Sequence, residues 1–267
     1  MNENRRNFLK KTAGAVLGIG AGLPLGQVAE GALGKHPTDE GVSGSTQWAM
    51  VIDIKKCLGE EVRQACSEAC RKAHNLPDIP NTSHEIKWIW TEEYQHVFPD
   101  QTHPQQATGV REQPVLTMCN HCKHPPCVRV CPTQATWRRD DGIVMMDMHR
   151  CIGCRYCMAA CPYGSRSFNF RDPDPYIAKD SNGKLPSDYP VRGKGVVEKC
   201  TFCAERIREG GTPACVEAVD AIPGAKGALT FGDLADPESG VSKLLRKEHT
   251  ICRRPSLGAE PSVYYIV

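Results

Sequence analysis

Residues 48–54 (WAMVIDI) form a mostly apolar stretch that alternates well enough to predict a β-strand leading toward Cys57. Two further extended runs flank Asp141-Gly142 within residues 136–147 (TWRRDDGIVMMD). An Asp-Gly step between two such runs favours the tight turn of a β-hairpin. The first elements that the pattern predicts are therefore a strand and a separate hairpin.

The segments between these elements show weaker periodicity. Residues 201–209 are expected to form a short helix, and residues 228–231 a strand. Residues 76–113 form an insertion without cysteine, and its apolar stretch at 86–90 fits either a strand or a packed loop. Residues 173–190 have the composition of a polar, proline-rich linker. The predicted fold class is α+β with long loops.

The residue pattern near the N-terminus predicts a targeting segment rather than a part of the folded domain. Arg5-Arg6 stand in the sequence RRNFLK, which is followed by a weakly apolar, Gly- and Ala-rich stretch at residues 12–26. That stretch is too short and too rich in glycine for a transmembrane helix. We interpret residues 1–34 as a twin-arginine signal peptide, which predicts export of the folded, cofactor-loaded chain to the periplasm.

Composition argues against several other classes of protein. Charged residues make up 24% of the chain and hydrophobic residues 40%, and the formal net charge is +2, so no basic block points to nucleic acid. The sequence has no Cys-x-x-Cys-His haem motif, no Gly-x-Gly-x-x-Gly loop and no evident catalytic acid–base pair. We therefore expect no substrate site in this chain itself, and membrane contact only through partner subunits.

Fifteen cysteines supply the candidate chemistry, and eight of them form two adjacent runs. Both runs end in Cys-Pro, and the second has the C-x2-C-x2-C-x3-C-P spacing of bacterial [4Fe–4S] ferredoxins. In two-cluster ferredoxins the fourth cysteine of each run binds the other run's cluster, so two such runs predict two cubanes with exchanged ligands. The first run is Cys119, Cys122, Cys127 and Cys131 (C-x2-C-x4-C-x3-C-P), and the second is Cys151, Cys154, Cys157 and Cys161.

Two other interpretations of these runs are disfavoured. Structural zinc uses two Cys-x2-Cys pairs set well apart, so that four ligands close one tetrahedron, whereas here a third cysteine follows at once. A disulfide scaffold suits small secreted domains, and 267 residues are enough to build a core without such crosslinks. Iron–sulfur electron transfer is the predicted chemistry, and a non-redox zinc or assembly protein is the alternative from another class.

The arrangement over residues 48–267 resembles the four-cluster ferredoxin subunits of membrane oxidoreductases. The resemblance rests on the twin-arginine leader, the two cysteine runs and a later segment, KCTFCAERI…PACVEA. The tryptophan-bearing insertion HEIKWIWTEEY, the irregular first cysteine group and the ending PSVYYIV look closer to the DsrO-type members. These members are the periplasmic iron–sulfur subunits of DsrMKJOP membrane complexes.

This resemblance implies tandem bacterial-ferredoxin-like [4Fe–4S] modules, one inserted into the other. The outer module would comprise residues 48–114 and 191–250, with the insertion at 76–113. The inserted two-cluster module would comprise residues 115–190, and residues 251–267 would form an extended C-terminal tail.

The resemblance also implies which cysteines share a cluster. The two complete runs exchange their fourth ligands. The last cysteine of the irregular first group (Cys57, Cys66 and Cys70) serves the cluster held by the cysteines near residue 200. Three [4Fe–4S] clusters then use twelve cysteines. The implied ligand sets are Cys119, Cys122, Cys127 and Cys161; Cys151, Cys154, Cys157 and Cys131; and Cys200, Cys203, Cys215 and Cys70.

The fourth cluster site of the family is incomplete in this chain. Its remaining candidates are Cys57 and Cys66, while Glu60 and Val219 stand where cysteines are expected. Two thiolates cannot hold a cubane unless Glu60 or a histidine substitutes, so three clusters rather than four are predicted. As a further hypothesis, Cys57 and Cys66 form a disulfide after export. His121, inside the first complete run, is expected to order the cluster loop rather than to bind iron.

The predicted function is electron transfer in the periplasm, as one subunit of a larger complex. By the resemblance, electrons pass between a polytopic quinone-interacting membrane subunit and a periplasmic multihaem cytochrome c, or another redox subunit, of a dissimilatory sulfur-metabolism complex. The alternative is the electron-transfer small subunit of a periplasmic molybdopterin reductase of the polysulfide, thiosulfate, tetrathionate or nitrite type. In either case substrate specificity resides in another subunit.

Overall fold

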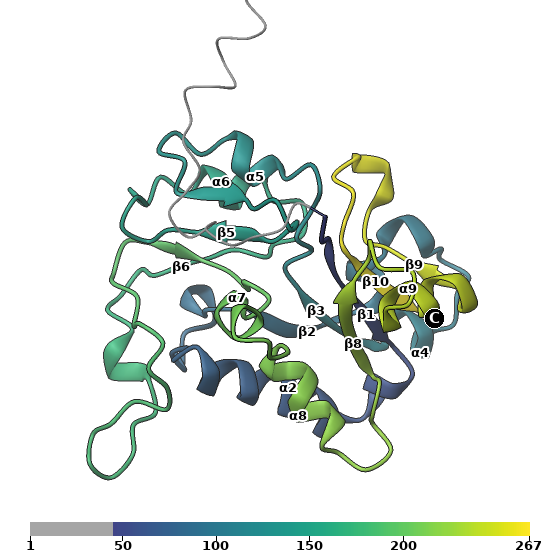
Figure 1. Ribbon diagram of the computed structural model, residues 1–267, viewed down its shortest axis with the longest axis horizontal. Helices are drawn as coiled ribbons and strands as arrows, with labels where there is room; N and C mark the ends of the chain where they lie inside the picture. The colour runs from purple at the N-terminus through teal and green to yellow at the C-terminus, as the bar shows by residue number, and fades with distance from the viewer. Residues whose placement is uncertain (1–44) are drawn as a thin grey trace, which may run out of the picture. The chain divides into compact units, whose positions relative to one another are not determined.

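The computed structural model describes residues 45–267, so the predicted signal peptide lies outside the described residues. A four-stranded sheet in the order β8-β1-β10-β9 carries the main core (Figure 1). β1 pairs antiparallel with β8 and parallel with β10, and β10 pairs antiparallel with β9. The C-terminal segment therefore supplies an inner strand of the sheet beside β1. The four strands are β1 (Trp48–Asp53), β8 (Leu229–Asp233), β9 (Thr250–Ile251) and β10 (Val263–Ile266).

β1 is buried on both faces of the sheet. Met50 and Ile52 belong to the main core, whereas Ala49 and Val51 belong to a smaller apolar layer with helix α9 (Gly240–Lys247). Successive side chains of a strand point to opposite faces, so one short apolar run serves both layers.

Helix α2 (Glu60–Ala73) presents cysteines to the core. Val62, Cys66 and Cys70 are its buried apolar residues, and their four-residue spacing places them on one face. Helix α8 (Ala214–Asp220) packs along α2. This pair of helices joins residues that lie far apart in the sequence.

Three antiparallel two-stranded ladders carry the remaining strands of the described chain. The β4–β5 hairpin is the one predicted around Asp141-Gly142, and Gly142 takes the positive φ (87°) that its turn requires. The apolar stretch at 86–90 leads into β2. The ladders are β2 (Ile89–Glu93) with β3 (Pro114–Met118), β4 (Thr136–Arg138) with β5 (Val144–Met146), and β6 (Ser167–Phe168) with β7 (Val197–Glu198).

The other helices are short, and three of the α-helices among them, α5, α6 and α7, carry or follow cysteines. The predicted helix at 201–209 is α7, and α3 and α4 lie in the insertion. The short α-helices are α3 (Tyr94–Val97), α4 (Thr108–Arg111), α5 (Pro126–Arg129), α6 (Tyr156–Ala160) and α7 (Ala204–Arg208). The 3-10 helices are η2 (Lys56–Leu58), η3 (Thr82–His84), η4 (Pro99–Gln101), η5 (Asp174–Tyr176) and η6 (Pro255–Leu257).

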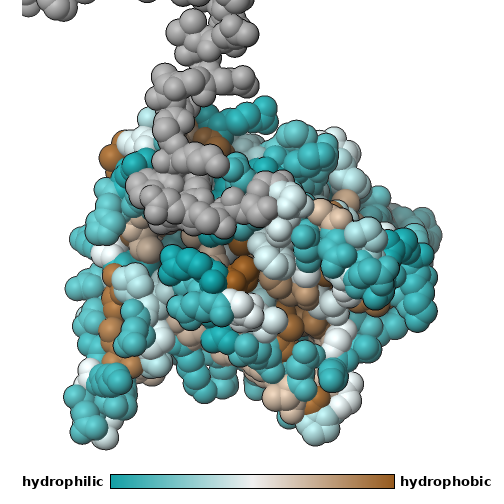
Figure 2. Space-filling view, viewed as in Figure 1, coloured by the Kyte–Doolittle hydropathy of each residue, from teal (hydrophilic) through white to brown (hydrophobic). Residues whose placement is uncertain are grey.

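Helices and strands are mixed, which confirms the predicted α+β content. In the part of the chain that the structure describes, no helix has the length and apolar character needed to cross a bilayer. On the face shown in Figure 2, the coloured surface is mainly hydrophilic, and apolar side chains gather only in small groups.

Candidate iron–sulfur centres

Four cysteines of the predicted inserted module converge on one enclosed space, which we call the central cavity. Cys119 and Cys122 lie in the loop after β3, Cys127 lies in α5, and Cys161 lies at the end of α6. The fourth thiol on this cavity is thus that of Cys161 from the second run, as the ligand exchange requires.

The thiols of the central cavity are crowded and poorly hydrated. Burial raises the pKa of Cys122, and the nearby Cys119 thiolate raises it further. Burial and Cys119 also raise the pKa of Cys161. Several thiolates can share such a space only around a cationic centre. Because thiolate is a soft ligand, the donor set fits an iron–sulfur cluster.

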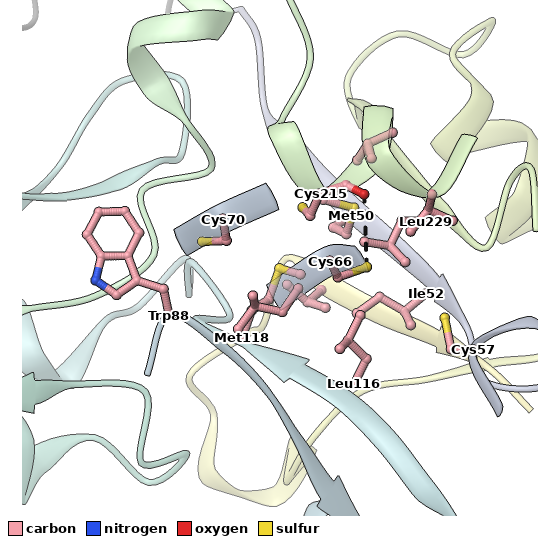
Figure 3. Close-up of a cluster of buried hydrophobic side chains, with 14 of the residues drawn as sticks. Met50, Ile52, Cys57, Cys66, Cys70, Trp88, Leu116, Met118, Cys215 and Leu229 are labelled. Atoms are coloured by element: carbon pink, nitrogen blue, oxygen red, sulfur yellow. Dashed lines mark hydrogen bonds between the residues drawn. The ribbon is translucent and has the colours of Figure 1, made fainter. Parts of the chain in front are cut away.

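A second space, the α2 cavity, is lined by cysteines from distant parts of the sequence. Cys70 comes from α2, Cys200 and Cys203 from the turn before α7, and Cys215 from α8. Figure 3 shows Cys70 and Cys215 on the two facing helices. The central and α2 cavities are thus each lined by four cysteines.

The turn that carries Cys200 and Cys203 has an unusual backbone conformation, and backbone N–H groups donate to both cysteine sulfurs. Phe202 and Cys203 both have left-handed backbone angles, with φ of 55° and 53°. The Phe202 N–H donates to Cys200 Sγ at 3.4 Å, and the Ala214 N–H donates to Cys203 Sγ at 3.4 Å. Non-glycine residues rarely adopt this conformation outside functional sites, and hydrogen bonds to sulfur adjust cluster potentials.

We call the four remaining predicted ligands the α6 set, after the helix that carries Cys157: Cys131, Cys151, Cys154 and Cys157. Cys157 is buried and shares an apolar cluster with Cys151, whereas the Cys154 side chain is exposed. Burial alone would raise the pKa of Cys131, but hydrogen bonds from the backbone at Thr136 and from Thr133 lower it overall. Helices α5 and α6 pack together, so the α6 set lies beside the central cavity and reaches the surface.

The two cysteines left over from the predicted cluster sets, Cys57 and Cys66, lie in the main core. Cys57 and Cys66 are fully buried free thiols in the main core, among apolar side chains such as Ile52 (Figure 3). Glu60 is exposed and accepts a hydrogen bond from the Gln64 side chain, so it does not face the two thiols. Burial raises the pKa of Cys57 to about 12.

His74 is a residue near the α2 cavity that sequence reasoning missed. It is fully buried, its Nε2 lies 3.1 Å from Cys203 Sγ, and its Nδ1 lies 3.5 Å from Glu205 Oε1. Burial, aided by nearby Arg192, lowers its pKa to about 3, so the ring is neutral. Its position four residues after Cys70, on the same helical face, was the available signal.

His121 connects the central and α2 cavities. Its ring is fully buried and stacks on Phe202 with 3.7 Å between ring centroids. His121 lies between Cys119 and Cys122 in sequence, while Phe202 lines the α2 cavity. The Val144 N–H donates to His121 Nδ1 at 3.0 Å, so the proton of the neutral ring is on Nε2. These contacts are those expected of a residue that orders the cluster loop.

A buried ion pair fixes β7 to the end of α2. The Arg192 Nε donates to Glu198 Oε2 at 2.7 Å, and the Trp88 indole N–H donates to the same oxygen at 3.0 Å. Arg192 also donates to the backbone carbonyl of His74. The pair therefore connects the segment around residue 192 with the wall of the α2 cavity.

Comparison with known proteins identifies the type of site. The 4Fe-4S dicluster domain model matches residues 113–173, which include both complete cysteine runs. The chain is 38% identical to the Hdr-like menaquinol oxidoreductase iron-sulfur subunit 1 of Archaeoglobus fulgidus, over 98% of this chain and 97% of the relative. This protein belongs to the same family of iron–sulfur electron-transfer subunits.

Other members of the family span a range of complexes. The chain is 36% identical to the menaquinone reductase iron-sulfur cluster-binding subunit of Nitratidesulfovibrio vulgaris, over 82% of this chain and 88% of the relative. It is 33% identical to a component of the polysulfide reductase of Wolinella succinogenes, over 82% of this chain and 94% of the relative. The family membership and the dicluster domain confirm [4Fe–4S] chemistry for the cysteine runs.

Proposed function

We propose that this chain is the periplasmic iron–sulfur subunit of a DsrMKJOP-type complex. It relays electrons between a quinone-interacting membrane subunit and a multihaem cytochrome c or other redox subunit. The observation that carries the electron-relay part of the proposal is the pair of four-cysteine cavities connected by the His121–Phe202 stack. Relatives that are subunits of menaquinol and menaquinone oxidoreductases support the quinone-linked partner.

The proposed ligands are twelve cysteines in three sets. The central cavity would hold one cluster, the α2 cavity a second and the α6 set a third. A [4Fe–4S] cluster, when bound, supplies reversible one-electron transfer. The chain contributes the thiolates, the N–H groups aimed at sulfur in the turn around Phe202, and the buried surroundings that exclude water.

The surface around Cys154 is the proposed contact for one redox partner. Cys154 is exposed, and its neighbours Ile152 and Tyr156 have exposed fractions of 66% and 62%. Large exposed apolar side chains are typical of protein–protein contacts, particularly when they surround a functional group. A partner bound there approaches the α6 set more closely than either cavity.

A second candidate function is the electron-transfer subunit of a molybdopterin reductase. It is favoured by the 31% identity, over the full length of this chain, to a component of the tetrathionate reductase of Salmonella typhimurium. The same cysteine sets would serve both complexes, so the internal geometry does not discriminate between them. The partners do.

Purification of the complex from its native membrane under anaerobic conditions tests both proposals. A multihaem cytochrome c and a polytopic quinone-interacting subunit in the purified complex support the first proposal, and a molybdopterin subunit supports the second. For this chain by itself, loaded with its clusters, we expect about twelve iron atoms, four for each cubane. A colourless preparation without a paramagnetic signal after dithionite reduction would exclude electron transfer altogether.

A further inference from the structure

A buried lysine lies between the central and α2 cavities. Lys199 has an exposed fraction of 1%, and its ammonium donates to the carbonyl oxygen of Cys200 at 2.7 Å and to that of Val144. Val144 lines the central cavity, and Cys200 lines the α2 cavity. The positive charge of Lys199 is therefore shared between two predicted cluster sites.

A buried arginine has the corresponding position between the central cavity and the α6 set. Arg166 has an exposed fraction of 5%, and its Nη2 donates to Cys127 Sγ at 3.0 Å and to Thr136 Oγ1 at 2.8 Å. The side chain lines the central cavity, and Cys157 of the α6 set lies within its electrostatic reach. Arg166 thus faces two cysteine sets as well.

Neither of these cations has an acidic partner among the residues that the structure describes. Within residues 45–267, no carboxylate lies within ion-pair distance of Lys199 or Arg166, whereas the equally buried Arg192 pairs with Glu198 at 2.7 Å. A buried charge without a counter-charge is strongly disfavoured. The counter-charge available to both side chains is that of thiolate-bound iron–sulfur clusters, which are anionic with four cysteine ligands.

We propose that Lys199 and Arg166 make the central cavity the site of highest reduction potential in this chain. This inference rests on the proposed three-cluster relay. The central cavity faces both of these cations. The α6 set faces Arg166, and the α2 cavity faces Lys199. The two arginines that also act on the α2 cavity, Arg192 and Arg206, are paired with the carboxylates of Glu198 and Glu217. A nearby positive charge favours the reduced, more negative form of a cluster, and local charge is one of the factors that set cluster potentials.

The electron balance of the relay is unchanged by this assignment. Each electron that a reduced partner subunit loses is gained by the chain and then passed to an oxidised partner subunit. The charges of Lys199 and Arg166 influence which of the three sites has the highest reduction potential, and therefore where the electron resides longest. The neutral contact of His74 with Cys203 acts only on the α2 cavity and is weaker than a full charge at a similar range.

Redox titration of the iron-loaded full-length chain, followed by electron paramagnetic resonance, tests this assignment. The variants are Lys199→Met, Lys199→Gln and Arg166→Gln, with Lys184→Met as the exposed control. Removing either buried charge should lower the equilibrium constant of the first one-electron reduction about tenfold or more. A tenfold change corresponds to about 59 mV. The Lys199 variants should also shift one later reduction step, and Arg166→Gln should shift the other.

The charge-conserving variants Lys199→Arg and Arg166→Lys should keep the first step within about threefold of the wild-type value. The two neutral Lys199 variants are measured together, so that a folding failure of one leaves the other. Iron analysis of the same samples distinguishes failure of the three-cluster relay from failure of the proposed role of the cations. A wild-type chain with fewer than about twelve irons would overturn the three-cluster relay. A fully loaded wild type, with a first step that both charge removals leave unchanged, would overturn the role of the cations.

Discussion

Cys66 and Cys70 form a matched pair for testing the cluster assignment, because they lie one helical turn apart on the same buried face of α2. Cys70 lines the α2 cavity with three other thiols, whereas Cys66 donates a weak hydrogen bond to the Cys215 carbonyl at 3.9 Å and otherwise contacts core side chains. Replacing each by alanine removes the same atom from the same helix.

The Cys70→Ala variant should lose one cubane, so its iron content falls from about twelve to about eight atoms per chain. Cys66→Ala should keep about twelve. Its cost is the cavity left by one buried sulfur, about 1 kcal/mol of unfolding free energy. Iron analysis and acid-labile sulfide analysis of anaerobically purified chains measure the loss, and urea denaturation measures the stability.

Equal iron loss in the two variants would refute the assignment of Cys70 but not Cys66 as an iron ligand, because it would indicate that Cys66 also binds iron. A wild-type chain with about sixteen irons would likewise show a fourth cubane. Since the two substitutions are chemically identical, a general destabilisation of α2 predicts similar iron loss in both. Unequal loss therefore reports ligation.

Three further predictions concern other parts of the molecule. Burial raises the pKa of Cys57 to about 12, so its thiol should be alkylated extremely slowly at pH 8. The alkylation rate should rise about tenfold for each pH unit up to pH 12, because the thiolate fraction rises by that factor. After denaturation without reductant, the thiol should label fully. Gly153→Ala should prevent binding of the cluster proposed at the α6 set and so lower the iron content by about four atoms per chain. Gly153 has φ of 70°, and an added Cβ would collide with the Gly195 carbonyl oxygen. Glu198→Gln should lower the unfolding free energy by about 3–5 kcal/mol in urea denaturation, because it leaves the Arg192 charge buried and unpaired.

Matched controls distinguish these effects from general disturbance. Gly164→Ala places a Cβ in open space at a similar φ of 66° and should retain all iron, so iron loss there would contradict the argument for Gly153. Glu217→Gln removes an exposed partner of Arg206 and should cost less than about 1 kcal/mol. Absence of label at both Cys57 and Cys66 after denaturation would instead support the disulfide hypothesis.

The local elements were largely predictable. The β-strand at the start of the outer module, the Asp-Gly hairpin and the helix after Cys203 each depend on a few neighbouring residues, and the structure contains all three. The insertion was ambiguous, because a short apolar stretch such as 86–90 has the same periodicity in a strand and in a packed loop. Pairing of β2 with β3 resolves that ambiguity.

The sequence by itself determined the chemistry, because the spacing of each complete cysteine run holds its thiols close together within a few turns of backbone. It also predicted that the fourth cluster site is incomplete, since Glu60 and Val219 stand where cysteines are expected. Family resemblance was needed to associate Cys70 with the cysteines near residue 200. Spacing alone gives no information across such a separation.

Only the tertiary structure decided what surrounds the thiols. His74 lies next to Cys203 across 129 positions of sequence, and Arg166 reaches Cys127 across 39. Lys199 looks like an ordinary charged residue until the packing of β5 against the turn before α7 buries it. Local spacing fixes which atoms can bind iron, whereas the electrostatic surroundings that set potentials arise from long-range packing, which leaves no periodic signal in the chain.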